Sequence, residues 1–451
     1  MPEISSEELK IAKLKHVLDV AGTNEPYISS SAKQELAFME EDKKNIECIS
    51  RLNNCYKLIN AVISDYIDMP ENYRKFASIW IIGTYFHEQF NTYPYLFFNA
   101  MRGSAKTRML KLISSLGHKG DGSVINNLTE AVLFRIPRNT VTCIDEFEQV
   151  NNREKQTLRE ILNSSYKKGM KVKRMKKKTT REGEEQVVDT FEPYFPIAMC
   201  NIWGVEEVLA DRSITLILEK SDNPFYTKKI EDFGTNEDIS FIKQELSELL
   251  TLLTLRYAKK EYIYNWNNYI REKYHNSHNV NNIIYINNIN NINNVINTDL
   301  EELELFNKID EAGISGRNFE LMLPILLTAK MISEDVFNEV LTISKELTTK
   351  KKEEEYADSK DVGVYEFVSG LDCLGQELMA VKELTQRFRN FLGETENDDK
   401  WLNEKWLGRS FKRLNLITYK VKKFNGSYVI LNYAKAREKL KMFKDKDEVE
   451  A

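Results

Sequence analysis

The sequence lacks the features that mark membrane proteins, secreted proteins and zinc proteins. It has no apolar run of about 18 residues, so we expect no membrane span. It begins MPEISSEELK, which is acidic and not followed by an apolar stretch, so we expect no signal peptide. Its five cysteines form no CxxC pair and no even disulfide framework. This pattern predicts a reducing, cytoplasmic location and argues against zinc.

The chain as a whole also has fewer basic than acidic residues, and its net charge is −5. Its distribution is uneven, however. Between Lys167 and Arg181, nine of fifteen residues are basic and none is acidic. From Trp401 to Lys441, eleven residues are basic and two are acidic. Two basic segments on an acidic chain are compatible with sites for a polyanion, although a solvated charge run is the alternative.

The 451 residues are enough for two or three domains. Apolar periodicity predicts a helical region at 1–75, interrupted by a loop at Gly22–Ser31, and an α/β core at 76–240. A helical region at 241–350 and a charged linker at 351–361 follow, then a separate unit at 360–440 and a charged tail at 441–451. Within the helical region, 276–297 contains eleven Asn and six Ile, which predicts a loop insertion.

The last unit has the order helix, helix, hairpin, which is that of a winged helix. We expect helices at Val381–Leu392 and Glu404–Leu414, and a hairpin that turns at Asn425-Gly426. Such a unit binds duplex DNA or a partner protein, and both remain open. Arg409 and Arg413 share one face of the second helix. The basic candidates are Lys405, Arg409, Lys412 and Arg413 on that helix, and Lys420, Lys422 and Lys423 in the wing.

A phosphate-binding loop is indicated after the apolar strand YLFF at Tyr95–Phe98. The loop NAMRGSAKT follows, and then the helical RMLKLISSLG. In this context Lys106 would reach the β- and γ-phosphates of ATP, and the Thr107 hydroxyl would ligate Mg²⁺. The candidate ATP-binding residues are Ala100, Met101, Arg102, Gly103, Ser104, Ala105, Lys106 and Thr107.

This loop departs from the pattern GxxxxGK[ST], because Ala100 and Ala105 replace the two glycines. An alanine is strained wherever the loop needs a positive φ. An ordinary turn between a strand and a helix is therefore the alternative. The second motif, TVTCIDE, supports the phosphate loop, because its apolar strand ends in Asp145 and Glu146. Asp145 would hold Mg²⁺ through its water shell and Glu146 would polarise the attacking water, whereas Asp145 alone also fits a helix N-cap.

Two further candidate site residues, Asn201 and Arg212, follow these two motifs along the chain. Asn201 ends the apolar strand FPIAMC, where a γ-phosphate sensor belongs, although it also fits an N-cap. Arg212, in LADRSITLILE, precedes another apolar strand and can project into the nucleotide of a neighbouring subunit. A surface salt bridge is the alternative for Arg212.

In this order, the four motifs resemble those of the AAA+ class of ring ATPases. The basic segment at 167–192 lies where superfamily 3 and minichromosome maintenance helicases insert a DNA-contacting hairpin. Minichromosome maintenance proteins also carry alanine before the lysine, as at Ala105, whereas Ala100 departs from them. From about Tyr66 to Ile332, segments such as LREILNSSYKKG and SGRNFELMLPILLTAKMI are similar to primase-associated helicases of phages, plasmids and archaeal mobile elements. The resemblance implies that Arg317 is a second sensor on the nucleotide, whereas an ordinary arginine on a helix surface is the alternative.

The basic hairpin offers charge without a surface that reads bases, which suits a motor that moves along DNA. Its candidate DNA contacts are Lys171, Lys173, Arg174, Lys176, Lys177 and Lys178.

The fold class we expect is α/β, an AAA+ P-loop ATPase core with an N-terminal helical region, a helical lid and a C-terminal winged helix. The expected function is ATP-dependent movement on single-stranded or forked DNA during replication of a mobile element. We expect a hexamer, ATP and Mg²⁺, and a primase or another replication protein as a possible partner. Two rivals remain, namely an ATP-regulated DNA-binding initiator and a non-hydrolysing scaffold.

Overall fold

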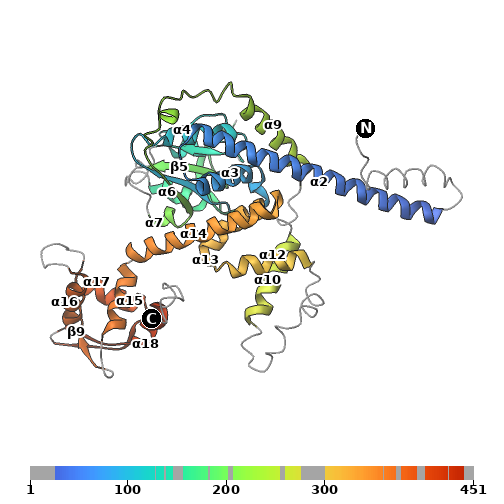
Figure 1. Ribbon diagram of the computed structural model, residues 1–451. Coiled ribbons are helices and arrows are strands. Elements are labelled where there is room, and N and C mark those ends of the chain that lie inside the picture. The colour runs from blue at the N-terminus through green and yellow to red at the C-terminus, as the bar shows by residue number, and fades with distance from the viewer. Residues whose placement is uncertain are drawn as a thin grey trace. The chain divides into compact units, whose positions relative to one another are not determined.

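A computed structural model of the chain divides into two compact units, residues 1–347 and 348–451 (Figure 1). Each unit is described by itself below. The structure describes residues 26–126, 128–136, 139–145, 156–180, 183–201, 207–253, 260–275, 300–358, 360–371, 377–393, 402–424 and 426–440. Glu146, the Asn-rich segment 276–297 and the tail 441–451 lie outside these residues.

The larger unit is mixed α/β and is organised by a four-stranded parallel sheet. Its strands are β1 (Tyr95–Ala100), β2 (Thr142–Ile144), β5 (Ile197–Asn201) and β6 (Ser213–Leu218), in the order β2-β5-β1-β6. Nearly every residue of β1 and β5 is buried, as is usual for parallel strands covered on both faces. An isolated parallel bridge between Ile125 and Ile144 extends the pairing beyond β2. The α/β class and the four core strands predicted from the sequence are confirmed.

Three helices position the start of β1 and the loop that follows it. They are α2 (Pro26–Tyr66), α3 (Glu71–Phe86) and α4 (Lys106–Leu116). The Trp80 indole donates to the Pro94 carbonyl at 2.9 Å, and the Tyr93 hydroxyl donates to the Trp80 carbonyl at 2.6 Å. A Cβ at Gly83 would lie 2.3 Å from the Tyr93 hydroxyl oxygen, so only glycine permits this approach. These contacts fix where β1 enters the sheet.

The remaining elements of the larger unit surround this core. Short helices are the 3₁₀ turn His87–Gln89, α5 (Glu130–Leu133), α7 (Glu207–Ala210) and α8 (Pro224–Thr227). Longer helices are α6 (Gln156–Ser164), α9 (Glu237–Leu252), α10 (Lys260–Ile270) with the π-helical turn Arg271–His275, α12 (Leu300–Glu311), α13 (Gly316–Ile332) and α14 (Glu334–Asp358). One hydrophobic core extends from Cys48 to Leu347 and joins the sheet to these helices.

A two-stranded antiparallel ribbon occupies the basic segment between α6 and β5. Its strands are β3 (Val172–Thr180) and β4 (Gly183–Phe191), which pair from Val172 and Phe191 to Thr180 and Gly183. This is where the sequence predicted a hairpin. Lys171 and Lys173 are exposed at its base.

The smaller unit builds its own core from helices and a three-stranded sheet. The helices are α15 (Lys360–Gly370), α16 (Val381–Leu392), α17 (Glu404–Arg413) and α18 (Tyr433–Leu440). The sheet has the order β7-β9-β8, formed by β7 (Met379–Ala380), β8 (Ile417–Lys423) and β9 (Gly426–Leu431). The predicted order of helix, helix and hairpin is therefore present.

Three local predictions were wrong. Helix α2 begins at Pro26, inside the segment predicted as a loop, because a proline at the first helical position loses no hydrogen bond. Helix α14 continues to Asp358 through the predicted charged linker, since Lys and Glu are good helix formers. Strands β8 and β9 pair as far as Lys423 and Gly426, so Gly426 belongs to the returning strand.

None of the helices in the described residues combines the length and the apolar character needed to cross a membrane.

Two buried histidines predict how the stability of the larger unit depends on pH. His87 is 1% exposed, and burial lowers its pKa to about 4, while burial also lowers the pKa of His118 to about 4. Below pH ~6.5 the unfolded chain binds protons that the folded chain does not, so stability falls as the pH drops towards 4. For His87 alone we expect a loss of about 2 kcal/mol at pH 5, measured by urea unfolding against pH 7.

The variant His87→Gln removes one titrating group and should weaken this pH dependence, whatever its own stability at pH 7. An unchanged pH dependence in the variant would contradict the assignment.

Candidate functional site

The carboxyl ends of the parallel strands gather several of the predicted site residues at one edge of the sheet. The loop 101–105 and helix α4 follow β1 there, Asp145 follows β2, and Asn201 ends β5. Strand β5 lies between β2 and β1, and Asn201 stands in register with Asn99. Ligands of open α/β sheets bind at this edge, outside the carboxyl ends of the strands.

Asp145 connects the loop to the second motif. The Thr107 hydroxyl donates to Asp145 Oδ2 at 2.5 Å, and Lys106 Nζ lies 3.9 Å from Asp145 Oδ1. The Lys106 and Asp145 side chains are 14% and 7% exposed, so this ion pair is largely shielded from water. Lys106, Thr107, Asp145 and the loop 101–105 are called the Lys106 site below.

The loop of the Lys106 site has a backbone suited to binding an anion. Gly103 and Ala105 both have left-handed backbones, with φ of 80° and 61°. Between them, the Ser104 hydroxyl donates to the Met101 carbonyl at 2.7 Å. Left-handed residues in such loops turn successive N–H groups to one side, and the N-terminus of α4 follows directly. Met101 and Arg102, the first two residues of this loop, are exposed.

The two alanines that replace glycine differ in backbone strain. Ala105 carries the positive φ, whereas Ala100 is a buried residue of β1 paired with Leu218 and has no positive φ. The strained position is therefore Ala105. The departure at Ala100 needs no unusual backbone.

Two residues near the Lys106 site were missed by the sequence analysis. Cys200 Sγ donates to Asp145 Oδ1 at 2.9 Å, because β2 and β5 pair Ile144 with Met199 and the residues that follow lie side by side. Lys220 follows β6, and its Cε lies 3.9 Å from where a Cβ on Gly103 would stand. Neither residue belongs to a recognisable motif, so only the strand order identifies them.

The two predicted arginines lie at the opposite edge of the sheet. Arg212 immediately precedes β6, and its carbonyl accepts from the Tyr95 N–H at the start of β1. The Arg212 and Arg317 guanidinium groups both lie over the Tyr166 ring, at 5.3 and 5.0 Å from its centroid. Strand β1 is six residues long, so about 20 Å separates this edge from the Lys106 site. The structure therefore does not bring Arg317 to the Lys106 site of its own chain, contrary to the second-sensor role that the resemblance implied.

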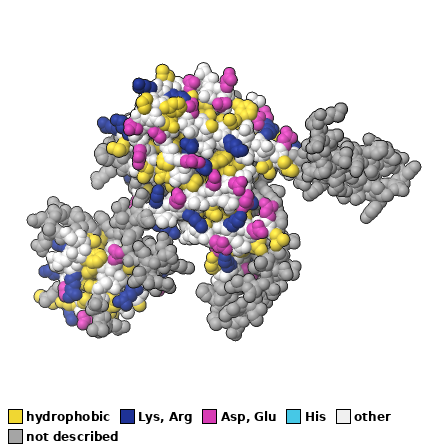
Figure 2. Space-filling view, in the orientation of Figure 1, with side chains coloured by type: hydrophobic (Ala, Val, Ile, Leu, Met, Phe, Trp, Pro, Cys, Tyr) yellow, Lys and Arg dark blue, Asp and Glu magenta, His cyan; other side chains and the backbone are white. Residues whose placement is uncertain are grey.

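The structure describes the basic side chains of the smaller unit more fully than those of the β3–β4 hairpin. Of the hairpin residues, the side chains of Arg174, Lys176, Lys177 and Lys178 lie outside the described part. In the smaller unit, Lys405, Arg409, Lys412, Arg413, Lys420, Lys422 and Lys423 are all exposed. Basic side chains prevail over acidic ones on the face of this unit seen in Figure 2. Phe424 is fully exposed beside Lys423 at the end of β8.

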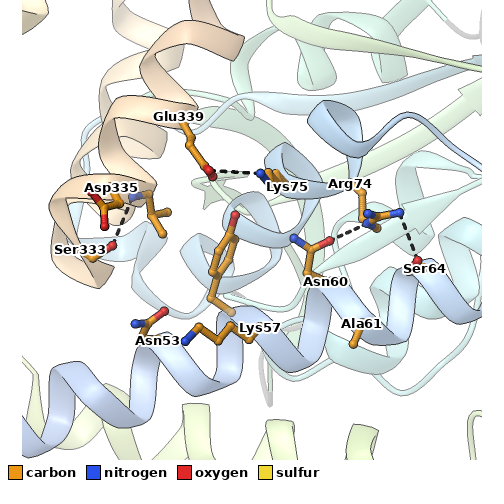
Figure 3. Close-up of a pocket in the computed structure, with 12 residues that line it drawn as sticks. Asn53, Lys57, Asn60, Ala61, Ser64, Arg74, Lys75, Ser333, Asp335 and Glu339 are labelled. Atoms are coloured by element: carbon orange, nitrogen blue, oxygen red, sulfur yellow. Dashed lines mark hydrogen bonds and ion pairs between the residues drawn. The ribbon is translucent and has the colours of Figure 1, made fainter.

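A cavity of about 550 Å³ lies elsewhere in the larger unit, between α2 and the first turns of α3 and α14 (Figure 3). Arg74 Nε donates to Asn60 Oδ1 at 2.6 Å, and Lys75 Nζ lies 3.2 Å from Glu339 Oε1. These bonds tie the three helices together. None of the predicted site residues lines this cavity.

The left-handed Ala105 generates a stability prediction. Ala105→Gly should stabilise the chain by about 1 kcal/mol, because glycine adopts a positive φ without a Cβ clash. Ala100→Gly is the matched control and should destabilise by ~0.5–1 kcal/mol, since it loosens an ordinary strand. Urea unfolding of both variants measures the difference, and a destabilised Ala105→Gly would contradict the loop geometry.

Comparisons with known proteins assign no family to these sites. No protein-family model matches the chain, and no curated protein matches it. The chemistry of the Lys106 site must therefore be inferred from its residues and their contacts.

Proposed function

We propose that the chain is an ATP-hydrolysing motor of the AAA+ helicase type that moves DNA during replication of a mobile element. It would act in the cytoplasm as a ring of six subunits. The observation that carries the proposal is the contact of Lys106 and Thr107 with Asp145, between a left-handed loop and a helix N-terminus. A lysine, a hydroxyl and a carboxylate in this arrangement are what ATP and Mg²⁺ require.

The residues present fit Mg²⁺. The Thr107 hydroxyl would ligate Mg²⁺, and the Asp145 carboxylate beside it would hold the ion through its water shell, which suits an ion that keeps several waters. When bound, Mg²⁺ would neutralise charge on the phosphates. Among the described residues no group of three His, Cys, Asp or Glu forms a different metal site.

The side chains of the Lys106 site have separable roles in this proposal. The loop amides and the N-terminus of α4 would hold the phosphates, and Lys106 would move from Asp145 to the β- and γ-phosphates. Asn201 would sense the γ-phosphate from the end of β5. Glu146, which directly follows Asp145, would orient the attacking water in line with that phosphate.

The position of the arginines favours an assembly. Arg212 and Arg317 are about 20 Å from the Lys106 site of their own chain, so in this proposal they would complete the site of a neighbour. Each site would then combine the Lys106 edge of one subunit with the arginine edge of the next. We therefore propose that Arg317, like Arg212, acts on the nucleotide of the adjacent subunit.

The backbone register of the hairpin ranks its candidate DNA contacts. Arg174 pairs with Asp189 and Lys178 pairs with Glu185, whereas Lys173, Lys176 and Lys177 pair with uncharged residues. Because directly opposite residues of a ribbon share a face, we expect Asp189 and Glu185 to weaken the attraction of Arg174 and Lys178 for phosphate. Lys173, Lys176 and Lys177 are then the main phosphate contacts on the DNA.

The smaller unit would be a winged helix that contacts DNA through α17 and the β8–β9 hairpin. Exposed Arg409, Lys412 and Arg413 on α17 provide charge, and exposed Phe424 beside Lys423 provides an aromatic surface for bases. The same exposed residues suit an ATP-regulated initiator, in which this unit recognises a DNA site. A sequence-specific footprint would favour that rival. Absence of ATP binding would favour the non-hydrolysing scaffold, with a primase or another replication protein as its partner.

The first test is ATP hydrolysis with and without single-stranded DNA. We expect turnover that rises with DNA in the wild type, loss of nucleotide binding in Lys106→Ala, and nucleotide binding with about 10²–10⁴-fold slower hydrolysis in Glu146→Gln. Lys228→Ala serves as the control, because Lys228 is an exposed lysine directly after α8. A folded wild type that binds ATP but never hydrolyses it would contradict the motor.

The second test separates the hairpin cations. The triple variant Lys173→Ala, Lys176→Ala and Lys177→Ala should weaken binding of single-stranded DNA and reduce the salt slope of log K by about 2. The double variant Arg174→Ala and Lys178→Ala should change the slope less per removed charge, because acidic residues stand opposite these positions in the backbone register. Fluorescence anisotropy at several salt concentrations gives both slopes. Equal slopes per removed charge would contradict the ranking.

A further inference from the structure

Tyr166 lies at the centre of the arginine edge, in a position that no motif assigns. It is 6% exposed, and both the Arg212 and the Arg317 guanidinium groups lie over its ring. Its hydroxyl also accepts from Arg317 Nη1 at 2.6 Å. A single buried side chain therefore contacts both arginines by their charged ends.

Two carboxylates complete this group. Asp211 Oδ2 lies 3.6 Å from Arg212 Nη1 and 3.4 Å from Arg317 Nε. Glu320 Oε2 lies 2.5 Å from Arg317 Nη1, while its other oxygen lies 3.3 Å from Lys167 Nζ. The Arg212 Nε group also donates to the Asn163 carbonyl at 2.8 Å. Tyr166, Asp211, Arg212, Arg317 and Glu320 are called the arginine cluster below.

The arginine cluster is continuous with the base of the hairpin. Directly after Tyr166, Lys167 forms a backbone bridge with Thr92, and the Lys168 N–H donates to the Asn91 carbonyl at 2.8 Å. The Gly169 N–H then donates to Glu192 Oε1 at 2.6 Å, which joins the chain entering β3 to the chain leaving β4. Only the five residues 167–171 thus separate Tyr166, whose ring contacts both arginines, from Val172, the first residue of the ribbon.

We propose that Tyr166 is a positioning residue that presents Arg212 and Arg317 as one unit to the nucleotide of the adjacent subunit, in register with the base of the DNA-contacting hairpin. This inference rests on the proposed ring ATPase and goes beyond it. A displacement of the hairpin base moves the Tyr166 backbone, and the ring carries both guanidinium groups with it. Hydrolysis at one site and movement of the neighbour's hairpin would then be coupled through a single side chain.

Mixed assemblies of full-length chains test this assignment. Lys106→Ala chains have an inactive site but intact arginines, and Arg212→Ala chains have an intact site but a broken cluster. Mixing them should restore hydrolysis, because the first chain supplies its arginines to the site of the second. Adding Tyr166→Leu to the Lys106→Ala chain should reduce the restored rate by about tenfold with KM unchanged. Adding the same change to the Arg212→Ala chain is the matched control and should leave the restored rate intact.

Each outcome has a distinct meaning. No restoration by the parent mixture, when wild type is active, would overturn the shared site and with it the basis for Tyr166. Restoration that survives Tyr166→Leu in the arginine-supplying chain would overturn the role of Tyr166 alone. An equal loss from Tyr166→Leu in either chain would reduce Tyr166 to a folding role and overturn the proposal as well.

A milder pair of variants guards against misfolding. Tyr166→Phe keeps the ring and removes only the bond from Arg317, so in the uniform assembly it should lower kcat less than Tyr166→Leu does. Tyr194→Phe removes another buried tyrosine hydroxyl, one bonded to the His87 and Phe90 carbonyls, and should leave kcat and DNA stimulation unchanged. Equal effects of Tyr166→Phe and Tyr194→Phe on kcat would contradict a specific role for Tyr166.

Discussion

The common direction of the four parallel strands is the constraint on which the rest of the larger unit depends. It places every strand's carboxyl end at one edge, where the loop before α4 and Asp145 meet, and every amino end at the other, where Arg212 enters β6. One edge therefore offers backbone N–H groups, a helix N-terminus and Lys106. The other offers two guanidinium groups. In the function proposed above, the Lys106 edge of one subunit would meet the arginine edge of the next.

Local energetics at the Lys106 site follow from the same sheet. Asp145 lies in a nearly dry position between β2 and β5, so its charge requires partners, and Lys106, Thr107 and Cys200 supply them. The left-handed Ala105 stores strain beside these residues. Such strain is tolerated because α3, α4 and β1 are fixed by buried contacts such as that of Trp80 with Pro94. A ligand that draws Lys106 away from Asp145 would therefore act on a preformed loop.

The sequence predicted those parts of the molecule in which local pattern and chemistry agree. Apolar runs marked the core strands, and the helix, helix, hairpin order of the smaller unit was evident from periodicity and the Asn425-Gly426 signal. It failed where polar or charged composition was read as a loop or a linker, because Pro26 can start α2 and the Lys and Glu residues of α14 favour a helix. The sequence did not indicate a role for Cys200, Lys220 or Tyr166. Their contacts are with residues far away in the sequence, which only the folded chain brings close to them. Glu146 and the Asn-rich segment lie outside the described residues, so the structure does not test the predictions made for them.

The most direct test of the account is an experimental structure of the assembled protein with Mg²⁺ and a non-hydrolysable ATP analogue. The account predicts the triphosphate on the loop between Gly103 and Lys106, with Lys106 withdrawn from Asp145, and the Arg212 and Arg317 side chains of the adjacent chain pointing at the γ-phosphate. The Tyr166 ring of that adjacent chain should still lie beneath both guanidinium groups. A nucleotide bound away from Lys106, or a site complete without a second chain, would contradict it.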